Sequence, residues 1–437
     1  RYIAKNNIQL YTINAIDKAI EIGMGKRTNT ILQSAFFTLA KVMPEEDAIR
    51  YMKEAATKSY LKKGQDVVDM NHKAIDAGAT AFVKVDVPAS WADAQDAPVV
   101  SEEHGRPEVV KMVDTLLKPI DKMNGDSLPV SAFMDHVDGT YQLGASAYEK
   151  RGVAVMVPTW NAETCAKCNK CSFVCPHATI RPFALNAEEL AAAPANMKKA
   201  PKPVVKTNYT YTLAISPLDC MGCGVGVGVC PTKSLKMVPL EGEEDQQAVF
   251  NYCVDNVSVK PETVGDTVIS SQFRKPLLEF SGSCAGCAET SYARLVTQLF
   301  GDRMYISNAT GCSSIWGGPA ATSPYTVDKN GHGPAWANSL FEDNAEHGFG
   351  IYLGQKAIRT RLQDKVKALI AIDYCDADIK AAAQTWLETY DDGRKNTAAT
   401  EALVKALEEG VCEGCPCDAC KLANEILQEK EYLSKKS

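Results

Sequence analysis

Two runs of cysteine residues are the part of this sequence whose spacing most clearly indicates chemistry. The first run has the pattern C-x2-C-x2-C-x3-C-P, and its cysteines are Cys165, Cys168, Cys171 and Cys175. Three thiolates two residues apart can surround one face of a four-iron cube, and the fourth, before a proline, ligates a second cube. A zinc site would require neither the third cysteine nor the proline. The run therefore predicts iron–sulfur clusters.

The second run lacks one cysteine of this pattern, because Gly226 stands where the third belongs. Crossed ligation gives the two expected ligand sets, which are Cys165, Cys168, Cys171 and Cys230 for one cluster and Cys175, Cys220 and Cys223 for the other. Three thiolates predict a [3Fe–4S] cluster, or a [4Fe–4S] cluster whose last iron takes water or another side chain. A sequence variant at Gly226 is an equally good explanation.

A third group contains Cys284, Cys287 and Cys312, with Glu289 close to the second of these. Three cysteines spaced as a pair plus a distant one indicate a cluster or metal site that lacks one ligand. From spacing alone, a structural role for Glu289 is as good an explanation as a functional one.

A fourth group lies near the end of the chain and consists of Cys412, Cys415, Cys417 and Cys420. A C-x-C step suits a four-iron cube poorly. We expect an unligated, redox-sensitive loop here, with a zinc ion or a transient disulfide as the alternatives.

Composition limits the class of protein. The chain has 437 residues, enough for roughly three domains, with 45% hydrophobic and 23% charged residues. Its net charge of −7 gives no support to binding of nucleic acid, and no apolar run approaches the roughly 18 residues that cross a membrane. Sixteen cysteines, mostly in tight groups, indicate metal ligands in a reducing cytoplasm instead of disulfides.

The elements that must position these cysteines follow from apolar periodicity and turn residues. Apolar residues at helical spacing behind Pro44 predict a helix over 45–56, and residues 81–85 predict a buried strand. Further helices are expected over 109–123, over 398–407 and around 422–427, a surface loop over 191–206, and loops lining a ligand site over 279–350.

Beyond the cysteine runs, several blocks of sequence resemble pyruvate:ferredoxin (flavodoxin) oxidoreductases. The blocks are residues 26–37, 125–133, 281–290, 308–317 and 333–346, in the order and spacing of that family. The resemblance covers essentially the whole chain. It implies a multidomain α/β fold with an inserted α+β two-cluster ferredoxin-like domain.

The resemblance also implies a domain organisation. Residues 1–100 would be the C-terminal part of an α/β domain of the coenzyme A-binding type, and 101–145 a small connecting domain. Residues 146–260 would be the ferredoxin-like domain, and 261–437 the N-terminal part of the α/β domain that binds thiamine diphosphate.

The family's activity is the oxidative decarboxylation of pyruvate to acetyl-CoA and CO2. Electrons leave through [4Fe–4S] clusters to ferredoxin or flavodoxin. By motif, Cys284, Cys287 and Cys312 resemble ligands of the cluster nearest the thiamine diphosphate, and Glu289 and Cys312 resemble contacts of that cofactor. Asn29 and Asn71 resemble coenzyme A contacts, although a helix-cap or turn role explains them equally well.

Several parts of the family's sequence are missing from this chain. The family's segment for Mg²⁺ and diphosphate, its fourth ligand to the nearest cluster, and its N-terminal domains have no counterpart here. We therefore expect an internal piece of a cytoplasmic, homodimeric enzyme, inactive by itself. The alternatives are a relative acting on another 2-oxoacid and a non-catalytic polyferredoxin-type electron carrier.

Overall fold

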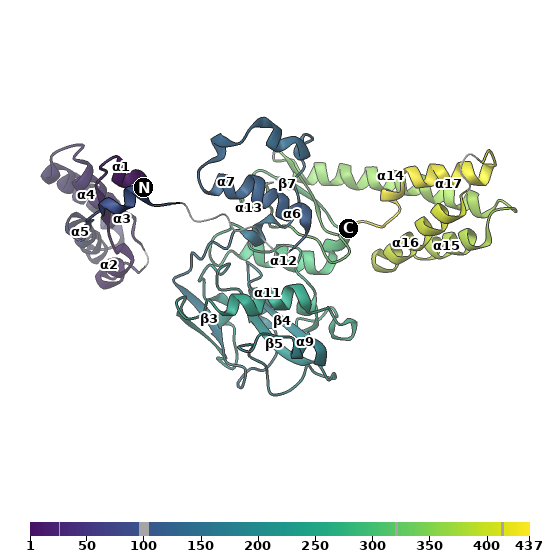
Figure 1. The fold of residues 1–437 in the computed structure, drawn as a ribbon, viewed down its shortest axis with the longest axis horizontal. Helices are drawn as coiled ribbons and strands as arrows, with labels where there is room; N and C mark the ends of the chain where they lie inside the picture. The colour runs from purple at the N-terminus through teal and green to yellow at the C-terminus, as the bar shows by residue number, and fades with distance from the viewer. Residues whose placement is uncertain (26, 96–104, 320–321, 412–414) are drawn as a thin grey trace. The chain divides into compact units, whose positions relative to one another are not determined.

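Residues 1–25, 27–95, 105–319, 322–411 and 415–437 are described by a computed structural model, which mixes helices with small two-stranded sheets (Figure 1). The chain divides into two units, Arg1–Val100 and Ser101–Ser437. None of the described helices combines the length and the apolar character needed to cross a membrane.

Helices dominate the first unit. Its elements are α1 (Tyr2–Lys5), β1 (Leu10–Thr12), α2 (Ala15–Ile22), α3 (Asn29–Ala40), α4 (Glu45–Tyr60), α5 (Gln65–Thr80) and β2 (Val83–Val85). The helix predicted behind Pro44 is confirmed as α4, whose acidic first turn suits the positive end of the helix dipole. Helix α5 can pass close to α3 because Gly78 has no side chain: a Cβ there would lie 2.2 Å from the Ile31 carbonyl oxygen.

The strand predicted over 81–85 is shorter and more exposed than expected. The observed strand is β2, which among the described strands pairs with β1 alone, in antiparallel orientation. Val83 within it is 64% exposed. The prediction of a buried strand was wrong because a two-stranded sheet has no further strands or second layer to bury its residues.

Short helices precede the cysteine runs in the second unit. Helix α6 (Pro107–Met112) continues through a π-helical turn (Val113–Leu117) into α7 (Lys118–Asp121). This confirms the helix predicted over 109–123. Its apolar face is buried and consists of Val109, Met112, Val113, Leu116 and Leu117.

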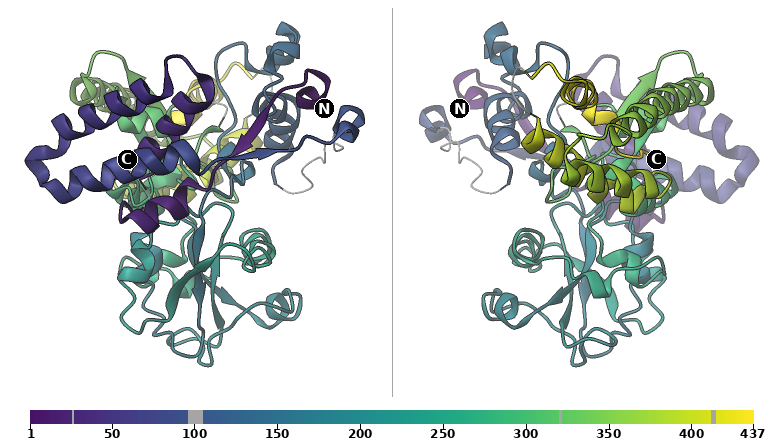
Figure 2. Two further views of the ribbon diagram at one scale, coloured as in Figure 1. Left: turned by 90° about the vertical axis from the view of Figure 1, so that its left-hand side faces the viewer. Right: turned by 90° about the vertical axis from the view of Figure 1, so that its right-hand side faces the viewer.

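Two antiparallel strand pairs frame the first two cysteine runs. The elements here are β3 (Met156–Trp160), α8 (Lys170–Val174), β4 (Ile180–Leu185), α9 (Ala187–Ala191), β5 (Thr210–Ile215), α10 (Val225–Gly228), β6 (Leu235–Pro239) and α11 (Gln246–Asn256). Strand β3 pairs with β6, and β4 pairs with β5; these strands run side by side in both views of Figure 2. Because β3 precedes the first run and β6 follows the second, their pairing joins both runs in one folded region.

The insertion between the runs packs more closely than a surface loop. Met197, Ala200 and Val204 are buried. The Ala200 N–H donates to the Tyr211 carbonyl oxygen (2.9 Å), which holds the insertion along β5. The prediction was therefore wrong for these apolar side chains, since sparse apolar residues in a Lys- and Pro-rich stretch gave no periodic signal.

The turn-rich segment from 279 to 350 contains more regular structure than predicted. Its elements are α12 (Ala288–Phe300), β7 (Tyr305–Ala309), α13 (Cys312–Gly317), β8 (Ala335–Ser339) and the start of α14 (Asn344–Ile370). Strands β7 and β8 are parallel. The prediction missed these strands because their small and polar residues show no clear apolar alternation.

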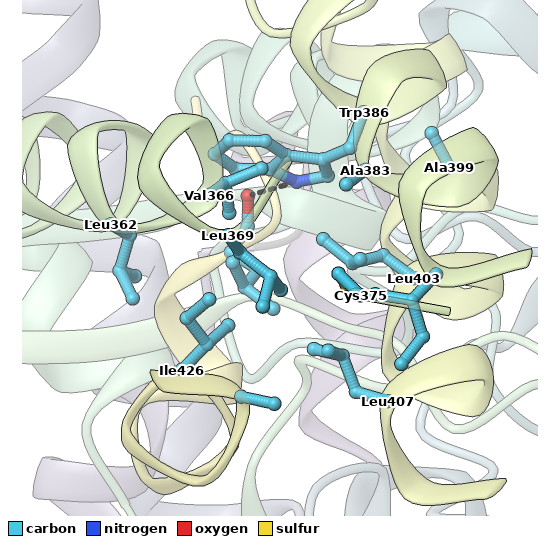
Figure 3. Packing of buried hydrophobic residues seen from close by; sticks show 13 residues of the cluster. Leu362, Val366, Leu369, Cys375, Ala383, Trp386, Ala399, Leu403, Leu407 and Ile426 are labelled. Atoms are coloured by element: carbon cyan, nitrogen blue, oxygen red, sulfur yellow. Dashed lines mark hydrogen bonds between the residues drawn. The ribbon is translucent and has the colours of Figure 1, made fainter. Parts of the chain in front are cut away.

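The last helices share one hydrophobic core, drawn in Figure 3. Helices α15 (Ala377–Glu388) and α17 (Asp418–Gln428) pack against α14, and α16 (Gly393–Gly410) packs against α15 and α17. Trp386 is completely buried, and its indole N–H donates to the Leu433 carbonyl oxygen (3.3 Å). Helices α16 and α17 confirm the two helices predicted near the end of the chain.

A buried ion pair links β4 to the segment that leads into the third cysteine group. Arg181 on β4 donates to the carboxylate of Glu279, and both side chains are 6% exposed. Burial alone would raise the pKa of Glu279, but the charges of Arg181 and Lys275 outweigh it and the pKa is lowered. The pair therefore fixes residue 279 against β4, in the sheet that lies between the two cysteine runs.

The Glu279→Leu change is expected to lower the free energy of unfolding by about 3–5 kcal/mol, because it leaves Arg181 buried without its partner. Replacing both residues, Arg181→Met with Glu279→Leu, is expected to restore most of that loss. Guanidinium denaturation followed by circular dichroism measures both variants. Equal losses in the single and double variants would show that the unpaired charge is not the cause.

Candidate iron–sulfur sites

The first group consists of four cysteines that come from both runs, Cys165, Cys168, Cys171 and Cys230. Burial, together with the neighbouring charges of Cys165, Cys168 and Cys230, raises the pKa of the Cys171 thiol to about 12. Asn169, which precedes α8, has φ +56°, so the backbone reverses tightly between the ligand candidates. Cys165, Cys171 and Cys230 also belong to one packed group of hydrophobic residues. That all four thiols bind one iron–sulfur cluster stays a prediction.

Backbone N–H groups point at the sulfurs of this group. The Lys167 N–H donates to Cys165 Sγ (3.4 Å), and the Ser234 N–H donates to Cys230 Sγ (3.2 Å). Burial would raise the pKa of Cys230, yet the N–H groups of Leu235 and Ser234 outweigh it, and the pKa is lowered. Such donors stabilise thiolates, the form that binds iron, so this donor set fits a cluster.

A second group contains three thiols. The pKa of Cys220 is raised to about 12, chiefly by burial and also by the charges of Cys175 and Cys223, against the Gly222 N–H that donates to its sulfur (3.4 Å). Cys175, Cys220 and Cys223 line one small pocket, and their assignment to one iron–sulfur cluster stays a prediction. This set has the same chemistry as the first group with one thiolate fewer.

Gly226 is buried in α10 beside this group. A Cβ at this position would lie 2.8 Å from Ile180 Cδ1 and 3.6 Å from Cys171 Cβ. The close atom of Ile180 is the end of a flexible side chain, so a small shift would make room for a side chain at 226.

The third group is more open. Cys284 and Cys312 are exposed and Cys287 is half-buried. Cys287 precedes α12 and its N–H donates to the Cys284 carbonyl oxygen (3.1 Å), whereas Cys312 is the first residue of α13. These cysteines thus lie at the starts of two different helices.

Glu289 joins these two helices. Its carboxylate, in the first turn of α12, accepts a hydrogen bond from the indole N–H of Trp316 on α13 (3.4 Å). Beside the Cys312 turn, the Asn308 side chain accepts from the Ser313 hydroxyl (2.6 Å) and donates to Asn338 (2.8 Å). These contacts connect the carboxyl ends of β7 and β8 to the helix that begins with Cys312.

The loop of the third group lies directly against the second group. A Cβ at Gly286, between Cys284 and Cys287, would be 3.5 Å from Cys223 Cβ. His177 fixes the approach, because its Nε2 lies 3.1 Å from the Ser283 carbonyl oxygen and 3.0 Å from the Ser283 hydroxyl. Burial lowers the pKa of His177, which favours the neutral ring.

A buried arginine reinforces the same junction. Arg294 on α12 donates to the Phe173 carbonyl oxygen (2.6 Å) and to Gln298 (2.6 Å). Burial lowers the pKa of Arg294 to about 10, the charge of Cys175 opposes that shift, and the guanidinium stays protonated at neutral pH. Sequence reasoning missed both His177 and Arg294, because single residues outside a motif gave no signal.

Asn29 and Asn71 both line a pocket of about 360 Å³ in the first unit. Asn29 is the first residue of α3, and Asn71 is 4% exposed. The Asn71 amide donates to the Val67 carbonyl oxygen one turn earlier (2.8 Å), so part of its hydrogen-bonding capacity is used within α5.

Comparison with known proteins adds a family context. Residues 2–81 match the family model of pyruvate ferredoxin/flavodoxin oxidoreductase, and residues 95–154 match a domain of unknown function. The chain is 45% identical to a pyruvate-flavodoxin oxidoreductase of Klebsiella pneumoniae, with 100% of this chain and 36% of that protein aligned. A pyruvate:ferredoxin oxidoreductase of Moorella thermoacetica is also 45% identical, over 100% of this chain and 37% of its own length. The chain therefore spans about a third of the length of these relatives.

Replacing Gly286 by alanine is expected to destabilise the second unit by about 1–2 kcal/mol, because φ at this glycine is +78° and a side chain is strained there. Gly282→Ala is the matched control, since its Cβ would meet only Arg151 at 3.6 Å and its φ is ordinary. Thermal unfolding of both variants checks the difference. A loss of similar size in the control would contradict this account.

Proposed function

We propose that this chain, a homologue along its whole length of pyruvate-flavodoxin and pyruvate:ferredoxin oxidoreductases, is the part of such an enzyme that moves electrons away from the reacting centre. The overall reaction would convert pyruvate and coenzyme A to acetyl-CoA, CO2, one proton and two electrons. Ferredoxin or flavodoxin, which the relatives' names mention, would accept the electrons.

The observation that carries this proposal is the contact between the third and second cysteine groups at Gly286 and Cys223. The first group in turn lies beside the second, since Gly226 faces both Ile180 and Cys171. Three adjacent groups of thiols support an order of transfer from the third group, through the second, to the first.

The chain's own residues would determine how clusters are held. Cys165, Cys168, Cys171 and Cys230 would bind one complete [4Fe–4S] cluster, and Cys175, Cys220 and Cys223 a cluster with one ligand fewer. When bound, such clusters supply one-electron carriers. The backbone donors orient the thiolates, and the strand pairs β3–β6 and β4–β5 support an α+β ferredoxin-like domain over 146–260.

Thiamine diphosphate with Mg²⁺ is the expected cofactor of the domain beginning at 261. Parallel strands β7 and β8 support this, because ligands of open α/β sheets bind at the carboxyl ends of the strands. Glu289 and Cys312 would then contact the cofactor, with Cys284 and Cys287 holding the nearest cluster beside Cys312. The Glu289–Trp316 hydrogen bond would orient the carboxylate.

Coenzyme A is the ligand proposed for the first unit, where Asn29 and Asn71 share one pocket. Residues 101–145 would connect this unit to the cluster region. A homodimer and a cytoplasmic location stay predictions.

The Gly226→Cys variant is expected to gain about one iron atom per chain after anaerobic reconstitution, because it completes the second ligand set. The electron paramagnetic resonance signal of the oxidised, three-iron cluster should weaken in parallel. The end of Ile180 can move to admit the new side chain.

Gly228→Cys is the control for this experiment. It adds a cysteine two residues away on the same helix, and its Cβ meets nothing within 4 Å. It should leave the iron content unchanged. Equal iron content in wild type and Gly226→Cys would overturn the assignment of a three-iron cluster to this set.

A chimera tests the function of the whole segment. This chain would replace the corresponding third of the Klebsiella pneumoniae enzyme, and we expect reduction of flavodoxin that depends on pyruvate and coenzyme A. Cys284→Ser or Glu289→Gln in the chimera should lower the rate by at least about tenfold. Cys253→Ala, which changes a buried cysteine outside the three groups, should not.

Iron and thiamine contents must be measured on the same samples. A chimera that holds both in full and still fails to reduce flavodoxin would contradict the proposal. Full activity in Cys284→Ser would contradict the role given to the third group.

A further inference from the structure

Three cysteines that take no part in the cluster groups converge at the turn between α16 and α17. Cys417 is the N-cap of α17, and its sulfur accepts a hydrogen bond from the Cys420 N–H (3.4 Å). Cys415 lies two residues earlier, separated from Cys417 by Pro416. Cys412 falls outside the described residues.

The spacing of the sulfurs distinguishes one metal ion from a cluster. The ligand atoms of Cys415, Cys417 and Cys420 all lie within 4.8 Å of one another, and the described chain holds no other such group of three. A tetrahedral zinc ion with bonds of about 2.3 Å needs sulfurs about 3.8 Å apart. Thiolates at different corners of a four-iron cube stand further apart, because each binds a separate iron.

We propose that Cys415, Cys417 and Cys420 bind a single Zn²⁺ ion. The expectation from the sequence alone was an unligated loop, and the convergence of the three sulfurs reverses that preference. Zinc binding at this turn does not depend on the proposed electron-transfer function.

The surroundings suit bound thiolates. Cys417 and Cys420 begin an 11-residue helix, whose N-terminal end favours negative charge. Cys420 is buried while Cys415 and Cys417 are half-buried, so an ion can enter from one side and still be sheltered from water.

The ion would have a structural role. Helices α16 and α17 both bury side chains in the core drawn in Figure 3, where Leu407 and Ile426 are labelled. Zinc would hold Cys415 against the first turn of α17. Its binding free energy would then add to the stability of this helical core.

The test uses the full chain with its clusters reconstituted anaerobically. Zinc and iron are counted by mass spectrometry, with about one tightly bound zinc per chain expected. X-ray absorption at the zinc edge should show three or four sulfur neighbours at about 2.3 Å. Two or fewer sulfur neighbours would overturn the proposal without the need for any variant.

The Cys415→Ser, Cys417→Ser double variant should lose this zinc and keep its iron, and serine can still cap α17. Asp418→Asn is the matched control: it changes an exposed charge in the same turn, where the Asp418 side chain is 80% exposed, and it should keep the zinc. Unchanged zinc in the double variant would place the ion elsewhere. Loss of iron instead of zinc from the double variant would also overturn the proposal. So would a disulfide between these cysteines with no zinc bound.

Discussion

A thiolate can exist inside a protein only if hydrogen-bond donors or positive charge reach its sulfur, and this constraint shapes the centre of the second unit. Burial raises the pKa of both Cys171 and Cys220 to about 12. These cysteines would stay protonated at neutral pH without compensation. A bound iron–sulfur cluster would provide the larger part of this compensation, since a coordinating thiol loses its proton. Backbone N–H groups aimed at Cys165, Cys220 and Cys230 provide the rest.

The same constraint explains why segments distant in sequence meet here. Donors and cations must be brought from outside the short cysteine loops, and they arrive through long-range contacts. His177 binds Ser283, 106 residues later, and Arg294 on α12 reaches back 121 residues to Phe173. The Arg181–Glu279 pair closes the same region from the side of β4. These contacts thus hold the segment of the third cysteine group against the segments around the second group.

The sequence predicted the parts of this region that are encoded locally. Apolar periodicity predicted α4, α16 and α17, whereas the ligand sets derived from the spacing of the runs stay predictions. Other features depend on partners that no local pattern identifies. The insertion at 191–206 packs because β5 accepts its backbone, and β7 and β8 form from small, polar residues. His177 and Arg294 acquire their roles only through contacts more than 100 residues away. The convergence of Cys415, Cys417 and Cys420 depends on where α17 begins, which spacing alone did not specify.

The buried guanidinium of Arg294 has a consequence for energetics. It is 1% exposed, so solvent screens its charge weakly, and the charge acts on Cys175 in the second group. A fixed positive charge favours whichever oxidation state carries more negative charge, and reduction makes a cluster more negative. Any cluster held by Cys175 would therefore have its reduction potential shifted upward relative to one in a neutral setting. The position of α12 would thus bias the direction of electron transfer between neighbouring clusters.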